Sequence, residues 1–582
     1  LAGLGRLAAQ GRSLGIHLVL ATQRPAGALG SDLRANLAIS ICLRVLNPAD
    51  SVDVISAPDG ARLPPIPGRA LLRGVGDTAG APRPVHAAWA GPPDAVRRVV
   101  DSLRAAAAAM GQPSASSLWA PPLPESMGAD ELPAPTISPN TRLPLLLTDR
   151  PAERRLIGWS WSPDLPLLIA GGAATGRSTA LQTLMSAALN RGWPVHLARG
   201  RPGRQEAAPL MPQSSGGLVG TAVGTDDPRR LVRLLELLTQ GTGPALLCID
   251  DVESVLDACD RMGGASGAER IGRLLQESRS HALAVAVTGP IEILSARWAS
   301  GIRHRLVLGP LDGTQAALAG VPRSTLGDRP PPGRGVLLGD GTAVVAHVLL
   351  PEATVSASPN DAPRPAPLRL RALPRHLSRA DVLRGASEGA GRTAAVPLGI
   401  GGDTAEVCLL DVRPGARVLV TGPPESGRTS ALCWVADRLR AAGRTVTWLS
   451  GGEEVVPRAQ PSPDGDTPSA AALVVDDADL LDRDAAAVVS RAWRGGTGVV
   501  IASARAEAVV GGFAGVTADL RDARQTLVLS PARGGPVHLP PAEVMPHADP
   551  ADPRRPGRGV LVGPRRAVPI QLPAPPAGGR AA

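Results

Sequence analysis

Short apolar runs alternate with helical patterns along most of the chain. Residues 165–170 (LPLLIA) and 245–249 (ALLCI) have the length and composition of buried strands, and an amphipathic helical pattern follows the first of them. The same order recurs at 417–421 and 471–475. Strands that alternate with helices predict an α/β fold of mainly parallel sheets flanked by helices.

The chain also repeats itself, which indicates related modules in tandem. GRLAAQGRS at 5–13 recurs as GRLLQESRS at 272–280, and a third version spans 488–505. An apolar strand follows each helical segment, at 18–21 in the first copy, and a Pro-Gly-Arg sequence comes later, beginning at Pro67, Pro332 and Pro556. Three landmarks in the same order predict three copies of one unit.

Two copies carry a glycine-rich loop between a strand and a helix. The loops fit the phosphate-loop pattern G-x4-G-K-[ST], except that arginine replaces lysine. Glycines let backbone N–H groups surround phosphates at a helix N-terminus. The hydroxyl of the serine or threonine that follows the basic residue holds Mg²⁺. The alternative is a glycine-rich turn that merely starts a helix. The residues predicted to bind nucleotide are Gly171, Gly176, Arg177, Ser178, Thr179, Gly422, Gly427, Arg428, Thr429 and Ser430.

An apolar strand that ends in two aspartates follows each loop. The pairs are Asp250-Asp251 and Asp476-Asp477. The first acid of each pair resembles the Mg²⁺-binding acid of a nucleotide site, and the second is placed to act as a base on water. We expect this strand to be adjacent to the strand before the loop. ATP and Mg²⁺ are the predicted cofactors, with Ser178, Asp250, Thr429 and Asp476 as metal ligands and Asp251 and Asp477 as candidate catalytic residues.

Arginine in the loops favours weak or absent hydrolysis. Its planar fork is bulkier and differently aimed than an ammonium group. Asp251 and Asp477 are also one methylene shorter than glutamate. All 61 basic residues of the chain are arginine, so the alternative is that arginine replaced lysine everywhere and works adequately here.

Composition limits the other classes of function. The net charge is +9, but the basic residues are spread along the chain, which favours ordinary solvated surface over a nucleic-acid patch. No apolar run reaches the roughly 18 to 20 residues of a membrane span. The five cysteines show no metal-ligand spacing and fit free thiols in a reducing cytoplasm.

The first copy resembles a known motor family. GRSLGIHLVLATQRP, LRANLAISICLRV and the Pro-Gly-Arg strand are similar to the C-terminal half of the FtsK/SpoIIIE motor domain. The resemblance implies RecA-like P-loop NTPase domains. It also implies that Gln23 senses the γ-phosphate and that Arg24 lies beside the nucleotide. The alternative for both residues is a strand end covered by solvated polar groups.

The order of modules and the connectors resemble EccC/EssC-type ATPases of type VII secretion. The connectors are SLWAPPLPESMGADEL and PLRLRALPRHLSRADV. Active members have lysine where this chain has Arg177 and Arg428. The resemblance implies a homo-oligomer such as a hexamer, membrane secretion components and a secreted protein as partners. It places the chain in the cytoplasm, at the inner face of the membrane through a part expected before Leu1.

The resemblance implies an ATP-binding translocase subunit that energises or regulates protein export by a type VII-like secretion machine. Two other functions stay open at this point. A DNA translocase of the FtsK/SpoIIIE type would use the basic surface, and a non-catalytic scaffold would keep three vestigial nucleotide folds. The absence of a winged-helix domain after the motor argues against the first. The two Asp-Asp strands argue against the second.

These features predict three modules joined by Pro-rich linkers that bury little apolar surface. Module one is the C-terminal half of a first ATPase domain, whose phosphate loop is expected upstream of Leu1. Modules two and three are degenerate ATPase domains. The expected boundaries are 1–92 for module one, 93–145 for a helix and Pro/Ser-rich linker, 146–350 for module two, 351–390 for a linker, 391–570 for module three and 571–582 for a tail.

Overall fold

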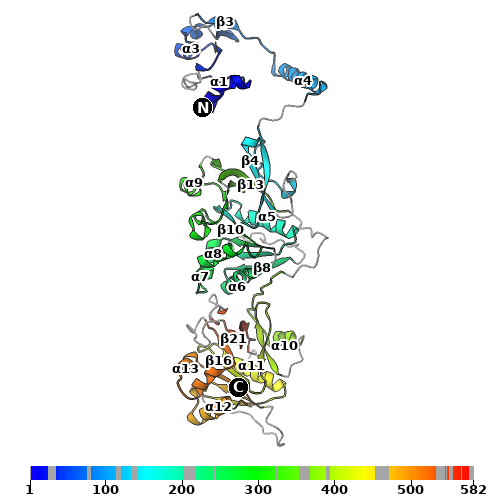
Figure 1. The fold of residues 1–582 in the computed structure, drawn as a ribbon, viewed down its shortest axis with the longest axis vertical. Coiled ribbons are helices and arrows are strands. Elements are labelled where there is room, and N and C mark those ends of the chain that lie inside the picture. The colour runs from blue at the N-terminus through cyan, green and yellow to red at the C-terminus, as the bar shows by residue number, and fades with distance from the viewer. Residues whose placement is uncertain are drawn as a thin grey trace. The chain divides into compact units, whose positions relative to one another are not determined.

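The computed structural model forms two compact units, residues 1–117 and residues 118–582 (Figure 1). Each unit is described by itself. The residues that the structure describes are 2–23, 35–74, 80–112, 119–132, 142–200, 218–241, 244–322, 325–339, 341–352, 367–387, 394–451, 471–496, 498–531, 544, 547–548, 555–564 and 566–575.

The first unit contains a small antiparallel sheet in the order β1-β2-β3. Cys42, Ile55 and Leu71 form its buried centre. The Pro-Gly-Arg sequence forms the turn before β2, where Gly68 has a φ of 82°, a conformation that glycine adopts without a Cβ clash. Its elements are α1 (Ala2–Gln10), the 3-10 helix η1 (Gly11–Leu14), β1 (Ser40–Leu43), α3 (Pro48–Ile55), η2 (Pro58–Arg62), β2 (Arg69–Arg73), β3 (Arg83–His86) and α4 (Pro93–Ala109).

Residues 18–21, expected as a strand, are not in a sheet in this unit. The matching strands of the second unit lie between two parallel neighbours, and strand geometry needs such partners for its backbone hydrogen bonds. The described residues of 1–117 contain no counterpart of those neighbours. Residues 18–21 therefore lack the pairing that would hold them extended.

Module two is built on a ten-stranded sheet in the order β5-β4-β13-β12-β11-β6-β10-β9-β7-β8. The block from β11 to β8 is parallel, and antiparallel strands extend it beyond β11. The strands are β4 (Leu143–Arg150), β5 (Arg155–Trp161), β6 (Leu167–Gly171), β7 (Val195–Arg199), β8 (Val219–Gly224), β9 (Ala245–Asp250), β10 (Leu283–Gly289), β11 (His304–Leu308), β12 (Arg334–Gly339) and β13 (Thr342–Val348). The helices are α5 (Arg177–Asn190), α6 (Pro228–Leu238), α7 (Val252–Asp260), α8 (Gly267–Glu277) and α9 (Gly313–Ala319), with short 3-10 turns η3 to η6 at Ala129–Glu131, Pro151–Glu153, Ile291–Ser295 and Arg297–Ala299.

The sheet of module two is buried on both faces, which explains its continuous apolar runs. Alternate residues of one strand point to opposite faces. Leu168 and Ala170 of β6 pack with α6, α7 and α8, whereas Leu167 and Ile169 pack with α5. Helices on both faces therefore hold the end of β6, and the loop that follows it, in a fixed place.

Module three repeats this plan with a nine-stranded sheet in the order β15-β14-β22-β21-β20-β16-β19-β18-β17. Helix α11 covers one face, and α12, α13 and α14 cover the other. The strands are β14 (Ala395–Gly401), β15 (Glu406–Asp411), β16 (Arg417–Thr421), β17 (Thr445–Ser450), β18 (Ala471–Asp476), β19 (Val499–Ala504), β20 (Gln525–Leu529), β21 (Arg558–Val562) and β22 (Ala567–Gln571). The helices are α10 (Arg379–Ser387), α11 (Arg428–Ala441), α12 (Arg483–Gly495), α13 (Ala506–Gly511) and α14 (Val516–Asp519), with η9 (Ala478–Leu480) and η10 (Leu520–Asp522).

These sheets confirm the predicted α/β class. The expectation that the strand before each loop is adjacent to the Asp-Asp strand is wrong, because another strand lies between them. β10 separates β6 from β9, and β19 separates β16 from β18. The inserted strands carry hydroxyl groups that bind the aspartates, as shown below.

The expectation that the connectors bury little apolar surface is also wrong for two segments. In the first connector, Leu123 is buried against β4. In the second, Leu370 and Leu377 are buried in the cores of modules two and three respectively. The module boundaries expected from composition stay a prediction. Within the described ranges, no helix is long and apolar enough to cross a membrane.

A buried histidine makes module two sensitive to acid. His196 of β7 is 1% exposed, and its Nδ1 accepts a hydrogen bond from Thr221 N at 3.1 Å. Burial lowers the pKa of His196 to about 4. The folded chain therefore keeps this ring neutral at pH values where the unfolded chain, with a pKa near 6.5, binds a proton.

We expect the free energy of unfolding to fall as the pH drops from about 6.5 towards 4, by on the order of 3 kcal/mol from this group. Urea unfolding followed by tryptophan fluorescence at several pH values measures the fall. His196→Gln should reduce it, whereas His281→Gln, a half-buried histidine of the same module, should not. Equal pH dependence in wild type and His196→Gln would contradict the expectation.

Candidate nucleotide sites

The two glycine-rich loops have the same backbone conformation. Ala174 and Glu425 have φ values of 57° and 62°, and Gly176 and Gly427 have φ values of 103° and 95°. Alternation of left-handed and right-handed residues turns successive N–H groups towards one point, which makes an anion-binding concavity. The helices α5 and α11 begin immediately after the second glycine, so their N-termini add a favourable dipole.

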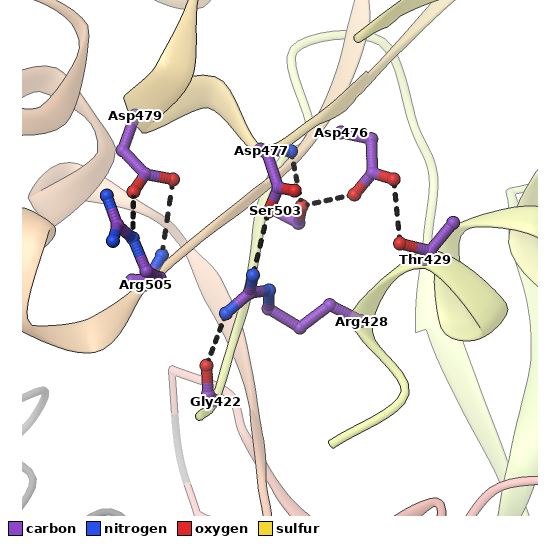
Figure 2. A network of polar contacts seen from close by, with 8 residues as sticks. All are labelled: Gly422, Arg428, Thr429, Asp476, Asp477, Asp479, Ser503 and Arg505. Atoms are coloured by element: carbon purple, nitrogen blue, oxygen red, sulfur yellow. Dashed lines mark hydrogen bonds and ion pairs between the residues drawn. The ribbon is translucent and has the colours of Figure 1, made fainter. Parts of the chain in front are cut away.

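In module three the predicted metal ligands are in contact. Thr429 Oγ1 donates to Asp476 Oδ2 at 2.8 Å, as Figure 2 shows. Asp476 is 7% exposed, and its other oxygen accepts from Ser503 Oγ at 2.7 Å. A hydroxyl and a carboxylate side by side are suitable ligands for Mg²⁺, which takes one or two carboxylates together with phosphate oxygens.

Arg428 lies across the same site. One guanidinium nitrogen donates to Gly422 O at 2.5 Å and the other to Asp477 Oδ1 at 2.7 Å (Figure 2). Its side chain is 13% exposed, so the pair is partly screened from water. In this arrangement Arg428 neutralises the candidate base Asp477, and phosphates must compete with that carboxylate for the cation.

A second ion pair lies beside the first in module three. Arg505 Nε donates to Asp479 Oδ2 at 2.6 Å, and the side chain of Asp479 is 2% exposed. The hydrogen bond to this carboxylate and its charge raise the pKa of Arg505. In the aligned repeats Arg505 occupies the place of Arg24, so an arginine at the end of this strand can serve a structural pair.

Module two has the two adjacent aspartates, but among the described residues its loop arginine forms no ion pair with them. Thr288 Oγ1 donates to Asp250 Oδ1 at 2.8 Å and accepts from Asp251 N at 3.1 Å. Asp251 Oδ2 accepts from Ser254 Oγ at 2.7 Å. Among the described residues, Arg177 and Ser178 make no hydrogen bond to either aspartate, so the two halves of this site are not joined as they are in module three.

The loop of module two is instead fastened to the Pro-Gly-Arg turn. Gly333 N donates to Thr175 O at 2.8 Å. A Cβ at Gly176 would lie 2.8 Å from Gly333 N, so only glycine fits there. In module three, by contrast, a Cβ at Gly427 would meet no described atom within 4 Å. The two loops have the same backbone conformation. The space beside their second glycine is filled in module two and open in module three.

The structure brings most of the predicted site residues together, in two separate groups. Gly171, Gly176, Arg177, Ser178 and Thr179 form the loop and first helical turn of module two, at the sheet edge that carries Asp250 and Asp251. Gly422, Gly427, Arg428, Thr429 and Ser430 do so in module three with Asp476 and Asp477.

Gln23 lies in the first unit and is exposed. Arg24 is outside the described residues. Their roles stay predictions, and no group of three or more His, Cys, Asp or Glu in the described ranges could hold a metal by itself.

Sequence reasoning missed the hydroxyl residues at the end of the inserted strand. Thr288 and Ser503 each donate to the first aspartate and accept from the backbone N–H of the second. A signal was present, because the three aligned strands end in VLAT, VAVT and IAS, which places Thr22, Thr288 and Ser503 in equivalent positions.

The fold and the two loops define the class of the chain as tandem P-loop NTPase-like domains. No family model matches the chain. The type VII secretion system protein EssC of Staphylococcus aureus is 43% identical over 63 residues, which cover 11% of this chain and 4% of that protein. The ESX-4 secretion system protein EccC4 of Mycobacterium tuberculosis is 30% identical over 224 residues, which cover 30% of this chain and 18% of that protein.

Solved structures of the same type share the fold. The cytoplasmic domain of the Thermomonospora curvata type VII secretion ATPase EccC matches with a TM-score of 0.59 and 19% identity, over 99% of this chain and 78% of that one. ATPases 2 and 3 of EssC from Geobacillus thermodenitrificans match with a TM-score of 0.51 and 14% identity, over 78% of this chain and 99% of that one. These matches confirm the predicted resemblance to EccC/EssC-type ATPases. The chain spans under a fifth of the length of these curated relatives.

The hydroxyl at the end of β19 should be necessary for the stability of module three. Ser503→Ala leaves Asp476 Oδ1 and the N–H of Asp477 without their partner, which should lower the free energy of unfolding by about 1–3 kcal/mol. Urea unfolding measures the change, with the half-buried Ser490→Ala of α12 as the matched control. A loss no larger than that of the control would show that the hydroxyl does not hold the pair.

Proposed function

We propose that modules two and three bind ATP with Mg²⁺ and regulate a type VII-like secretion ATPase, with little or no hydrolysis of their own. The observation that carries the proposal is the contact of Thr429 with Asp476 beside a loop of anion-binding conformation. A carboxylate, a hydroxyl and converging N–H groups at a helix N-terminus are the elements that a Mg²⁺–triphosphate needs.

Further support comes from a polar group in the loop of module three. Ser426 is 2% exposed, and its hydroxyl has no hydrogen-bond partner among the described residues. A buried hydroxyl without a partner is unfavourable by about 1–3 kcal/mol. A bound phosphate oxygen in this loop is a suitable partner for it.

Weak or absent turnover in module three follows from the charges at its site. The guanidinium group of Arg428 is paired with Asp477, the residue that would have to act as base. Catalysis of phosphoryl transfer depends on positioned charges around the γ-phosphate. A guanidinium already paired with the base supplies less of that charge, and it blocks the base as well.

The role in secretion is inferred from the relatives. EssC and EccC4 are proteins of secretion systems, and the solved relative from Thermomonospora curvata is the cytoplasmic domain of its ATPase. By this inference the chain acts in the cytoplasm next to the membrane. Its partners would be further copies of itself, membrane secretion components and an exported protein. DNA translocation stays the alternative, and no contact in the described ranges favours it.

Binding is tested by isothermal titration of the full chain with ATP and Mg²⁺. We expect binding at micromolar or weaker affinity. Arg428→Lys should bind ATP about tenfold more tightly, because an ammonium group cannot keep both hydrogen bonds to Gly422 and Asp477 and is then free to bind phosphate. A Ser178→Val, Thr429→Val double variant is the control without metal-binding hydroxyls. Absence of heat in wild type together with binding by Arg428→Lys would show that arginine has abolished the site.

Hydrolysis is tested by phosphate release from the purified full chain. We expect the rate to equal that of a variant in which Asp250, Asp251, Asp476 and Asp477 are all changed to Ala. Turnover clearly above that variant, near the roughly 1 per second of ordinary enzymes, would contradict the regulatory assignment.

A further inference from the structure

A cavity of about 870 Å³ lies beside the glycine-rich loop of module three. Gly427 and Ser430 line it on the side of the loop and α11, and Gly557 lines it on the side of the Pro-Gly-Arg turn. Arg375 and His376 of the second connector line another part. The volume is within the range of small-molecule pockets. A nucleotide with its phosphates in the loop therefore has room for its nucleoside part here.

The beginning of this connector is part of module two. Leu370 is 6% exposed and belongs to the core packed by α6, α7 and α8. Thr221 of β8 fixes the backbone there, because its Oγ1 accepts from Leu370 N at 2.8 Å and donates to Leu368 O at 2.9 Å. Thr221 is itself 2% exposed, and its hydrogen bond with Leu370 N is buried.

Hydrogen bonds to its backbone, one of them from an arginine side chain, hold the connector between this anchor and the cavity. Arg371 N donates to Asp403 O at 2.9 Å, and Arg558 donates to Pro374 O at 3.3 Å. Within the cavity wall, Leu377 O accepts from Ala574 N at 2.9 Å. A connector fixed at these points transmits the position of its first residues to the residues that line the cavity.

We propose that residues 368–378 are a structural part of the ligand site of module three, and that Thr221 of module two is a positioning residue for it. The ligand class is a nucleoside triphosphate, with phosphates at Gly427 and the nucleoside against Arg375 and His376. This rests on the proposed nucleotide binding by module three. Module two thereby sets the affinity of its neighbour through the chain that joins them.

The test compares Thr221→Val with Thr148→Val in the full chain. Thr148 is an equally buried threonine of module two whose hydroxyl donates to Ile157 O at 2.7 Å, away from the connector. Hydrogen exchange is measured on peptides that cover 371–378 without ligand. Loss of the two hydrogen bonds of Thr221 should make exchange there about tenfold faster in Thr221→Val only.

The same peptides, with those covering 425–431, are then titrated with ATP–Mg²⁺ and with magnesium tripolyphosphate. Protection at 425–431 reports binding at module three alone. Thr221→Val should weaken ATP about tenfold and leave tripolyphosphate within twofold, because only the nucleoside part meets the connector. Thr148→Val should change neither ligand.

Two results overturn the proposal and are distinguishable. Unchanged ATP affinity in Thr221→Val, despite a loosened connector, shows that the connector is not part of the site and leaves the proposed function intact. Absence of protection at 425–431 by both ligands in wild type refutes nucleotide binding by module three, and the proposal with it. His376→Ala, an exposed change in the cavity wall, gives the same ATP-against-tripolyphosphate comparison if Thr221→Val does not fold.

Discussion

In each of modules two and three, one hydroxyl group on a central strand holds the pair of aspartates in place. Thr288 and Ser503 donate to the first aspartate and accept from the N–H of the second. Asp251 and Asp477 have left-handed backbones, with φ values of 55° and 48°, which few residues adopt without support. The hydroxyl supplies that support from the strand that lies between the loop strand and the Asp-Asp strand. The order of the sheet thus places the hydroxyl beside both aspartates.

Arginine in the loop pairs with an acidic residue of module three in a way that lysine cannot reproduce. Its two nitrogens reach Gly422 O and Asp477 at once, which the single point charge of lysine does not do in the same geometry. Without it, two carboxylates would follow one another at the end of β18, with hydroxyl partners for Asp476 alone. The arginine offsets that repulsion in the empty site, and it is therefore stabilising in the state where nucleotide is absent. In module two, Asp251 accepts a hydrogen bond from Ser254 instead, so the same residues of the motif make different contacts.

The loops, the Asp-Asp strands and the α/β class could be predicted from the sequence because each is a local pattern. The order of strands in a sheet is not local, and for that reason the insertion of β10 and β19 was missed. Packing of the connectors was missed for a similar reason. Leu370 is surrounded by arginine and proline in the sequence, and only the tertiary structure places it in a core. Residues 18–21 show the converse, since an apolar run forms a strand only where neighbours accept its hydrogen bonds.

Each connector packs against the Pro-Gly-Arg turn of the module that follows it. In both modules the arginine of the Pro-Gly-Arg turn donates to carbonyl oxygens of a Leu-Pro sequence upstream, Arg334 to Leu123 and Pro124, and Arg558 to Pro374. The same turn borders the glycine-rich loop, through Gly333 in module two and through the shared cavity wall at Gly557 in module three. In each module the turn therefore lies between a connector and the glycine-rich loop. In module three that connector carries Leu370, which belongs to the core of module two, so one short segment joins the core of module two to the wall of the proposed ligand site of module three.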